Sequence, residues 1–205
     1  LNNMSSFRFK QFSIQQDKCA MKVGTDGVLI GAWMSNVKGD LLDVGCGTGL
    51  LSLMMTQRNK DVLIDAIDID ELAYLQTLGN VKESKWNDQI TVFHSSLQEF
   101  ETSKKYQLIF SNPPYFVQSF KSPKKTRNTA RHTDDLSFLE LLEGVVPLLS
   151  DDGIFALILP VVEAHIFIDL ANENGLFLNR KCEVKPNFEK LSKRIMMEFS
   201  FFNSE

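Results

Sequence analysis

Short apolar runs alternate with stretches of helical hydrophobic spacing along most of the chain. After Leu50 and again between 163 and 174, apolar residues recur every three or four positions, as on an amphipathic helix. Continuous apolar runs of strand type lie between such stretches, at residues 40–44, 62–67, 89–93, 106–110 and 153–159. Alternating strands and helices predict an α/β fold with a mostly parallel sheet.

The C-terminal part departs from this alternation. Residues 136–149 read as a helix interrupted late by Pro147, and Gly175 is a stop signal for the helix over 163–174. Two further apolar runs, 177–184 and 195–202, are joined by a polar turn and predict a closing hairpin. We therefore predict one doubly wound domain over residues 1–205, with an antiparallel last strand.

The turn after the first predicted strand is rich in glycine. Residues 43–49 read Asp-Val-Gly-Cys-Gly-Thr-Gly. Glycines there would let backbone amides approach a ligand, and the helix that follows would point its positive end at a carboxylate. A dinucleotide-binding turn needs glycine where Leu50 stands, and a phosphate loop needs a Gly-Lys-Ser/Thr ending that is absent. A plain tight connection between strand and helix is the structural alternative.

This turn resembles the Asp-x-Gly-x-Gly-x-Gly signature of class I methyltransferases that bind S-adenosylmethionine. The resemblance implies that cofactor and the Rossmann-like class I methyltransferase sheet, mostly parallel with an antiparallel last strand. It places cofactor contacts at Asp43, Gly45, Cys46, Gly47 and Gly49.

Further cofactor contacts are expected where the next two strands end. Asp68 follows the second apolar run, where an acidic side chain can accept both ribose hydroxyls, and Ile69 would cover one face of the adenine. Asp70 is expected to cap the helix over 72–81. The resemblance adds Ser96, facing the adenine amino group, and the Leu97 amide, facing a ring nitrogen, although the family usually has aspartate where Ser96 stands.

The candidate catalytic residues are Asn112, Pro113, Pro114 and Tyr115, directly after the run 106–110. A nucleobase amine is a poor nucleophile because its lone pair is delocalised into the ring. The Asn112 side-chain oxygen and the Pro113 carbonyl would favour a pyramidal amine and stabilise the positive charge that develops on it, at ~3 kcal/mol per group. The prolines fix φ and lack a competing N–H, and Tyr115 offers a ring for stacking.

This tetrapeptide predicts methyl transfer to a nitrogen conjugated with a π system. It leaves open N6 of adenine, N4 of cytosine, N2 of guanine and the side-chain amide of glutamine. A proline turn that merely ends a strand is the structural alternative.

Charge distribution favours a polyanionic substrate. The chain has 22 Lys and Arg against 26 Asp and Glu, a net charge of −4, yet residues 121–132 carry five basic residues and no acid. Residues 180–194 carry six basic residues and two acids. Concentrated positive charge is typical of nucleic-acid contacts, although a solvated loop is the commoner fate of such runs. The predicted RNA contacts are Lys121, Lys124, Lys125, Arg127, Arg131 and His132.

A second resemblance covers nearly the whole chain. The segments 9–12 and 17–33, together with the glycine turn, residues 112–115 and residues 121–132, resemble bacterial methyltransferases that make N6-methyladenosine in valine tRNA, immediately 3′ of the anticodon. Residues 1–39 would then cover the cofactor, residues 40–205 would form the Rossmann-like core, and 116–135 would be its basic loop. Lys22, Thr25 and Asp26 are carried over as cofactor contacts; Thr25 or Asp26 could instead simply cap a helix over 27–34.

An anticodon stem-loop is a reasonable RNA target because its unpaired bases can be splayed out and stacked. Methyltransferases that modify a glutamine of translation release factors share the Asn-Pro-Pro-Tyr tetrapeptide found here at 112–115. They typically add an N-terminal helical bundle. The alternatives are the same chemistry on ribosomal RNA, DNA or a protein glutamine, and a non-catalytic RNA-binding protein.

Composition predicts a cytoplasmic protein. The sequence shows no leader of the secretory type and no apolar run of membrane length. Its three cysteines are widely spaced, which suits a reducing compartment, and its three histidines show no metal-ligand spacing with them. We expect a monomer that binds no metal and no membrane.

Overall fold

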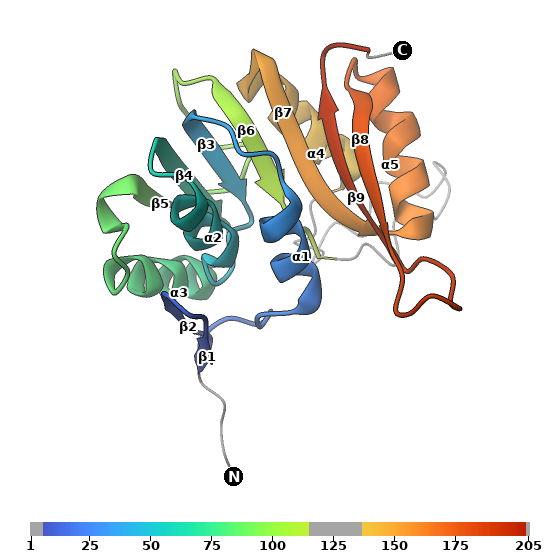
Figure 1. The fold of residues 1–205 in the computed structure, drawn as a ribbon. Coiled ribbons are helices and arrows are strands. Elements are labelled where there is room, and N and C mark those ends of the chain that lie inside the picture. The colour runs from blue at the N-terminus through green and yellow to red at the C-terminus, as the bar shows by residue number, and fades with distance from the viewer. Residues whose placement is uncertain (1–5, 115–136, 204–205) are drawn as a thin grey trace, which may run out of the picture.

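A seven-stranded sheet covered by helices on both faces organises the chain (Figure 1). The computed structural model describes residues 6–114 and 137–203. The sheet has the order β5-β4-β3-β6-β7-β9-β8, and a separate two-stranded hairpin pairs β1 with β2. The strands are β1 (Ser6–Arg8), β2 (Ser13–Gln15), β3 (Gly39–Val44), β4 (Val62–Asp68), β5 (Ile90–His94), β6 (Tyr106–Ser111), β7 (Leu149–Pro160), β8 (Phe177–Val184) and β9 (Arg194–Ser200). The helices are α1 (Thr25–Trp33), α2 (Leu50–Arg58), α3 (Glu71–Lys82), α4 (Phe138–Val145) and α5 (Val161–Glu173), with 3-10 turns η1 (Asn87–Gln89) and η2 (Val146–Leu148).

The predicted fold class is confirmed. Neighbouring strands from β5 through β7 are parallel, and β9 runs antiparallel to both β7 and β8. The last strand is therefore inserted between its two predecessors and reverses direction. This is the arrangement expected for a class I methyltransferase sheet.

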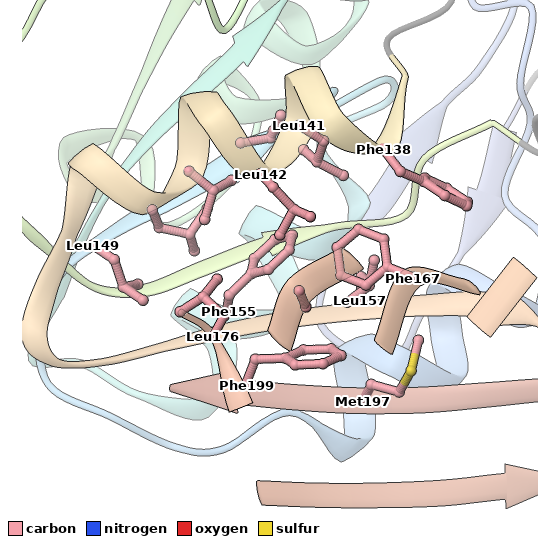
Figure 2. Close-up of a cluster of buried hydrophobic side chains, with 14 of the residues drawn as sticks. Phe138, Leu141, Leu142, Leu149, Phe155, Leu157, Phe167, Leu176, Met197 and Phe199 are labelled. Atoms are coloured by element: carbon pink, nitrogen blue, oxygen red, sulfur yellow. The ribbon is translucent and has the colours of Figure 1, made fainter. Parts of the chain in front are cut away.

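Side chains along the central strands point alternately to the two faces of the sheet, which produces two separate hydrophobic cores. On β7, Phe155, Leu157 and Leu159 face the cluster beneath α4 and α5, whereas Ala156 and Ile158 face the cluster beneath α1 and α2. Phe167 of α5 is the centre of the first cluster: its ring meets those of Phe138 and Phe199 at 5.3 and 5.5 Å, both edge to face (Figure 2). Both faces of the sheet are thus buried, as parallel strands require.

Predicted helix boundaries hold where capping chemistry sets them. Asp70 caps α3, because its carboxylate accepts from the Leu72 N–H at 2.9 Å. Gly175, with φ of +78°, follows α5 as predicted. The start of α4 was instead predicted at residue 136; a reciprocal capping box of Ser137 and Glu140 sets it at Phe138.

One sequence-based expectation about elements was wrong, one element was missed, and one structural alternative is excluded. The helix predicted over 136–149 ends at Val145, because Pro147 imposes a 3-10 turn and β7 already begins at Leu149. The hairpin of β1 and β2 was not predicted, since strands of three residues carry too little pattern. Helix α1 begins at Thr25 with Gly24 as its N-cap, so neither Thr25 nor Asp26 caps it.

A buried carboxylate fixes α1 to the sheet. Glu198 of β9 is 3% exposed and accepts from the N–H and the hydroxyl of Ser35, just after α1, at 2.6 and 2.8 Å. Arg180 of β8 donates to the same carboxylate at 3.0 Å, and its guanidinium lies 4.1 Å from the Trp33 ring centroid. Polar contacts therefore join three elements that are distant in sequence.

Replacing Glu198 by glutamine should destabilise the protein by about 2 kcal/mol, because an amide N–H₂ would then face a donor at a site that now receives three hydrogen bonds. Urea denaturation followed by circular dichroism measures this loss. The control is Asp61→Asn, which breaks an exposed ion pair with Lys38 at 2.8 Å and should change stability little. Equal losses in the two variants would contradict this account of Glu198.

Candidate active site

Four strand ends lie side by side at one edge of the sheet. The register pairs Val44 of β3 with Ser111 of β6, Val44 with Ile67 of β4, and Asp68 with His94 of β5. We call this the carboxyl edge; it comprises residues 45–49, 68–70, 94–97 and 112–114. The glycine turn, the acidic turn and the catalytic candidates, predicted from separate segments, are thus brought together.

The glycine turn uses a left-handed backbone three times. Gly45, Gly47 and Gly49 have φ values of +71°, +56° and +76°, which disfavour any residue with a Cβ. A Cβ at Gly45 or Gly47 would meet nothing within 4 Å, so the backbone at these two positions borders open space. A Cβ at Gly49 would instead lie 3.0 Å from the Thr77 side chain. Two glycines therefore leave room for a ligand, and the third allows close packing against α3.

The amides of this turn are engaged within the protein. The N–H groups of Gly45 and Cys46 donate to the Ile67 carbonyl at 2.9 and 3.0 Å, and the Gly47 N–H donates to Asp68 at 2.8 Å. The sequence suggested amides directed at a ligand. In the structure the bonds of these three amides fix the turn, and Gly45 and Gly47 leave space beside it.

Asp43 lies beneath the turn and is fully buried. One of its oxygens accepts from the Ser52 hydroxyl at 2.6 Å and from the Ser52 N–H at 3.2 Å, so it takes up a first-turn amide of α2. The other oxygen has no partner among the described residues. Burial raises the pKa of Asp43 to about 7; the bonds from Ser52 lower this pKa, and the charge of Asp68 raises it.

Asp68 and Ile69 occupy the end of β4. The carboxylate of Asp68 accepts from the N–H groups of Gly47 and Asp70 at 2.8 and 3.0 Å, and burial raises its pKa. A carboxylate has about four acceptor sites, so two remain for further donors. Ile69 is 58% exposed, which is unusual for an isoleucine, and lies beside this carboxylate at the carboxyl edge.

Ser96 and Leu97 follow β5. The Ser96 hydroxyl donates to Glu99 at 3.0 Å, so a carboxylate is held close to the position where aspartate is usual. Leu97 is 6% exposed and packs against α4, where a Cβ at Gly144 would be only 2.5 Å from it. The side chain of Leu97 therefore anchors this loop in the core.

Asn112 follows β6 directly beside the glycine turn. The Ser111 hydroxyl donates to the Val44 carbonyl at 2.8 Å and fixes the strand end. Pro113 is buried, whereas Pro114 is exposed. Within residues 6–114 and 137–203, the Asn112 side chain makes no hydrogen bond. Its amide nitrogen lies 3.7 Å from the position of a Cβ at Gly27, so Asn112 lies against the first turn of α1.

Sequence reasoning missed the polar face of α3 that supports the turn. Asn80, 2% exposed, accepts from the Gln15 N–H and donates to the carbonyls of Gln15 and Thr48, all at 2.8 Å. Thr77 donates to the Gly47 carbonyl at 2.8 Å, and Gln76 accepts from the Lys18 N–H at 2.8 Å. Three polar residues on one turn and a half of a helix were the available signal. They join the N-terminal segment to the glycine turn.

A second contact that was missed joins α1 to β9. Arg194 donates to the carboxylate of Asp26 at 2.8 Å, across 168 positions of sequence. Lys22 and Thr25 are exposed on the same segment. Asp26 therefore has a basic partner that the sequence did not suggest, and the next residue, Gly27, lies against Asn112 at the carboxyl edge. Tyr115 and the basic residues between 121 and 132 lie outside the described residues.

Comparison with known proteins identifies the family. The model of the methyltransferase small domain matches residues 21–133. A tRNA1(Val) (adenine(37)-N6)-methyltransferase from Pseudoalteromonas translucida is 47% identical over 98% of this chain and 86% of its own length. A protein of the same name from Trichodesmium erythraeum is 50% identical over 96% of this chain and 84% of its own length. The chain belongs to the tRNA1(Val) (adenine(37)-N6)-methyltransferase family.

The fold of this family member is shared by more distant proteins of known structure. The structure of M. jannaschii TYW2 in complex with AdoMet superposes with a TM-score of 0.63 at 13% identity, over 95% of this chain and 85% of that one. None of the helices in the described ranges combines the length and the apolar character that a membrane span requires. The same residues contain no group of three or more histidine, cysteine or acidic side chains placed to hold a metal ion.

Asp43 should leave a signature in the pH dependence of stability. Its pKa in the folded protein, about 7, lies above the ordinary value of 3.8, so folding takes up a proton between these two pH values. The contribution of Asp43 is thus most favourable at low pH and declines as pH rises toward 7. Relative to Asp43→Asn, the free energy of unfolding of the wild type should fall by up to roughly 4 kcal/mol between about pH 4 and pH 8.

Urea denaturation of both proteins across this pH range measures the difference. Ser52→Ala, which removes the hydroxyl that favours the charged carboxylate, should extend the decline to higher pH. A difference between wild type and Asp43→Asn that stays constant with pH would contradict the assignment.

Proposed function

We propose that this protein transfers a methyl group from S-adenosylmethionine to N6 of the adenosine immediately 3′ of the anticodon in valine tRNA. The observation that carries this conclusion is the pairing of β3 with β6. It sets Asn112 and Pro113 beside a glycine turn that borders open space. The relatives at 47% and 50% identity, which are named for this reaction, support the same substrate.

The carboxyl edge fits the cofactor. Open space beside Gly45 and Gly47, spare acceptor capacity on Asp68 and the exposed Ile69 next to it match a ligand with a chain, a ribose and a flat base. When bound, S-adenosylmethionine supplies an electrophilic methyl group on a sulfonium. Gly45, Gly47 and Gly49 would line its chain, Asp68 would accept its ribose hydroxyls, and Ile69, Ser96 and the Leu97 amide would surround its adenine.

Other assigned residues would act from beneath or above this site. Asp43 and Cys46 are buried, so we assign them to shaping the turn and its electrostatic potential. Lys22, Thr25 and Asp26 would cover the methionine end of the cofactor from the N-terminal segment. The contacts of Asn80 and Gln76 with that segment support this cover, because they tie it to the helix behind the turn.

Asn112 and Pro113 would act on the target amine. The Asn112 oxygen and the Pro113 carbonyl accept the two amine hydrogens out of the base plane, which restores electron density to nitrogen. The same two dipoles stabilise the positive charge that develops there, in a rigid geometry fixed by two prolines. Asn112 has no other hydrogen bond among the described residues, so its oxygen is available for this role. Tyr115 would stack on the flipped adenine.

The RNA would lie across the carboxyl edge, with Lys121, Lys124, Lys125, Arg127, Arg131 and His132 on its phosphates. We further propose that residues 1–205 act as one domain and as a monomer in the cytoplasm. All three cysteines are unpaired in the structure, which suits a reducing compartment.

Asn112→Ala should reduce methyl transfer to unmodified valine tRNA by about 100-fold or more, because one of the two acceptors at the amine is lost. Transfer of labelled methyl groups, followed by nucleoside analysis, measures this rate. Asn36→Ala is the matched control, since Asn36 is exposed just before β3 at the opposite edge of the sheet. Labelling of guanine or of protein alone by the wild type would refute the proposed reaction.

Asp68→Asn should weaken S-adenosylmethionine binding about tenfold, because a neutral amide is a poorer acceptor for ribose hydroxyls. Calorimetric titration with the cofactor alone gives the Kd. Asp70→Asn is the control, because asparagine also caps helices well and should leave the Kd unchanged. Equal affinities of Asp68→Asn and the wild type would remove Asp68 from the cofactor site.

A further inference from the structure

The loop between β8 and β9 projects from the end of the sheet at which β6 ends (Figure 1), and Asn112 directly follows β6. It comprises residues 185–193, with the sequence Lys-Pro-Asn-Phe-Glu-Lys-Leu-Ser-Lys. We call it the β8–β9 loop. Arg194, where β9 begins, pairs with Pro160 at the carboxyl end of β7, so the loop extends beyond the carboxyl edge.

Internal hydrogen bonds give the β8–β9 loop a defined shape. The Lys193 N–H donates to the Val184 carbonyl at 2.8 Å and closes its base. At the tip, the Asn187 side chain accepts from the N–H groups of Glu189 and Lys190 at 3.2 and 3.0 Å. This turn holds its aromatic residue away from the protein: Phe188 is 103% exposed. Leu191 is 85% exposed on the same loop, so the loop presents two apolar side chains that are accessible to a partner.

Positive charge surrounds this ring. Lys185, Lys190 and Lys193 are exposed on the loop, with Glu189 as its acid. Of the other basic residues of the cluster 180–194, Arg180 is engaged with Glu198 and Arg194 with Asp26, and Lys181 is exposed on β8. Three of the four remaining lysines of the cluster are therefore on the loop that carries Phe188. The flat ring of Phe188 can stack on a nucleobase, and the lysines beside it can contact the phosphates on either side of that base.

The base of the β8–β9 loop is connected to Asn112 through the first turn of α1. Arg194 is paired with Asp26 in the first turn of α1. The next residue, Gly27, is the one whose Cβ position lies 3.7 Å from the Asn112 amide. A nucleic acid bound on the loop would therefore approach Asn112 from the side of α1.

We propose that the β8–β9 loop is a docking element for the substrate RNA, in which Phe188 stacks on an unpaired nucleotide other than the target adenosine. Lys185, Lys190 and Lys193 contact the phosphates beside that nucleotide. This inference rests on the proposed function, because it takes the substrate to be an RNA with an unpaired loop. It adds a second contact surface to the basic residues between 121 and 132.

Binding of an anticodon stem-loop RNA, measured by fluorescence anisotropy without cofactor, tests the stacking. Phe188→Ala and Phe188→Leu should each raise the Kd about tenfold, whereas Phe188→Tyr should bind like the wild type, because only an aromatic ring can stack. Leu191→Ala is the control, since Leu191 is 85% exposed on the same loop but offers no ring. Equal effects of Phe188→Tyr and Phe188→Ala, or no effect of either, would overturn the proposal.

Salt dependence tests the lysines. Changing Lys185, Lys190 and Lys193 together to glutamine should reduce the slope of log Kd against log salt by about 2, at roughly 0.7 per phosphate contact on a single strand. An unchanged slope would overturn the lysine contacts. Failure of the wild type to bind or methylate tRNA would refute the proposed function itself. If the wild type methylates tRNA and Phe188→Ala binds the RNA as tightly as the wild type, only the docking element is refuted. The same holds if Phe188→Ala loses self-association but still binds the RNA.

Discussion

The parallel pairing of β3 with β6 is the constraint on which the site depends. It aligns Val44 with Ser111, so the glycine turn and Asn112 leave the sheet as neighbours although more than sixty positions separate them. The hydroxyl of Ser111 on the Val44 carbonyl fixes this alignment at the point where both strands end. A shift of one residue would direct Asn112 to the other face of the sheet. The chemistry is therefore determined by register as much as by residue type.

Supporting structure converges on the same edge from both sides. From α3, Asn80 and Thr77 hold the carbonyls of Thr48 and Gly47. From β9, Glu198 holds the end of α1 and Arg194 holds its beginning. Because the last strand and the third helix are both needed, the site has the stability of the whole domain and does not form as a local motif. The buried Asp43 weakens this arrangement as pH rises, which is a cost that an active site commonly carries.

Strands and helices with a long hydrophobic pattern or a specific capping residue could be predicted from the sequence. The central strands, the Asp70 cap and the closing hairpin were predicted because periodicity and capping are local. The end of α4 was misplaced because a proline can shorten a helix or merely bend it. The contacts of Asn80 and the pair Asp26–Arg194 could not be predicted, since they join segments 65 and 168 positions apart and neither belongs to a motif. The bonds that the amides of Gly45, Cys46 and Gly47 make within the protein could not be predicted, because the pairing of β3 with β4 brings their acceptors, Ile67 and Asp68, near.

The position of β9 between β7 and β8 has a consequence for synthesis on the ribosome. Among the described strands, β8 pairs with β9 alone, which is made later, so β8 leaves the exit tunnel before its partner exists. Until β9 emerges, the nascent chain lacks Arg194 and Glu198, and α1 has neither of its anchors from that strand. The N-terminal segment and the β8–β9 loop with Phe188 would then become ordered in the same late event. An incompletely translated chain would be unable to engage its substrates, and prematurely terminated products would be inert.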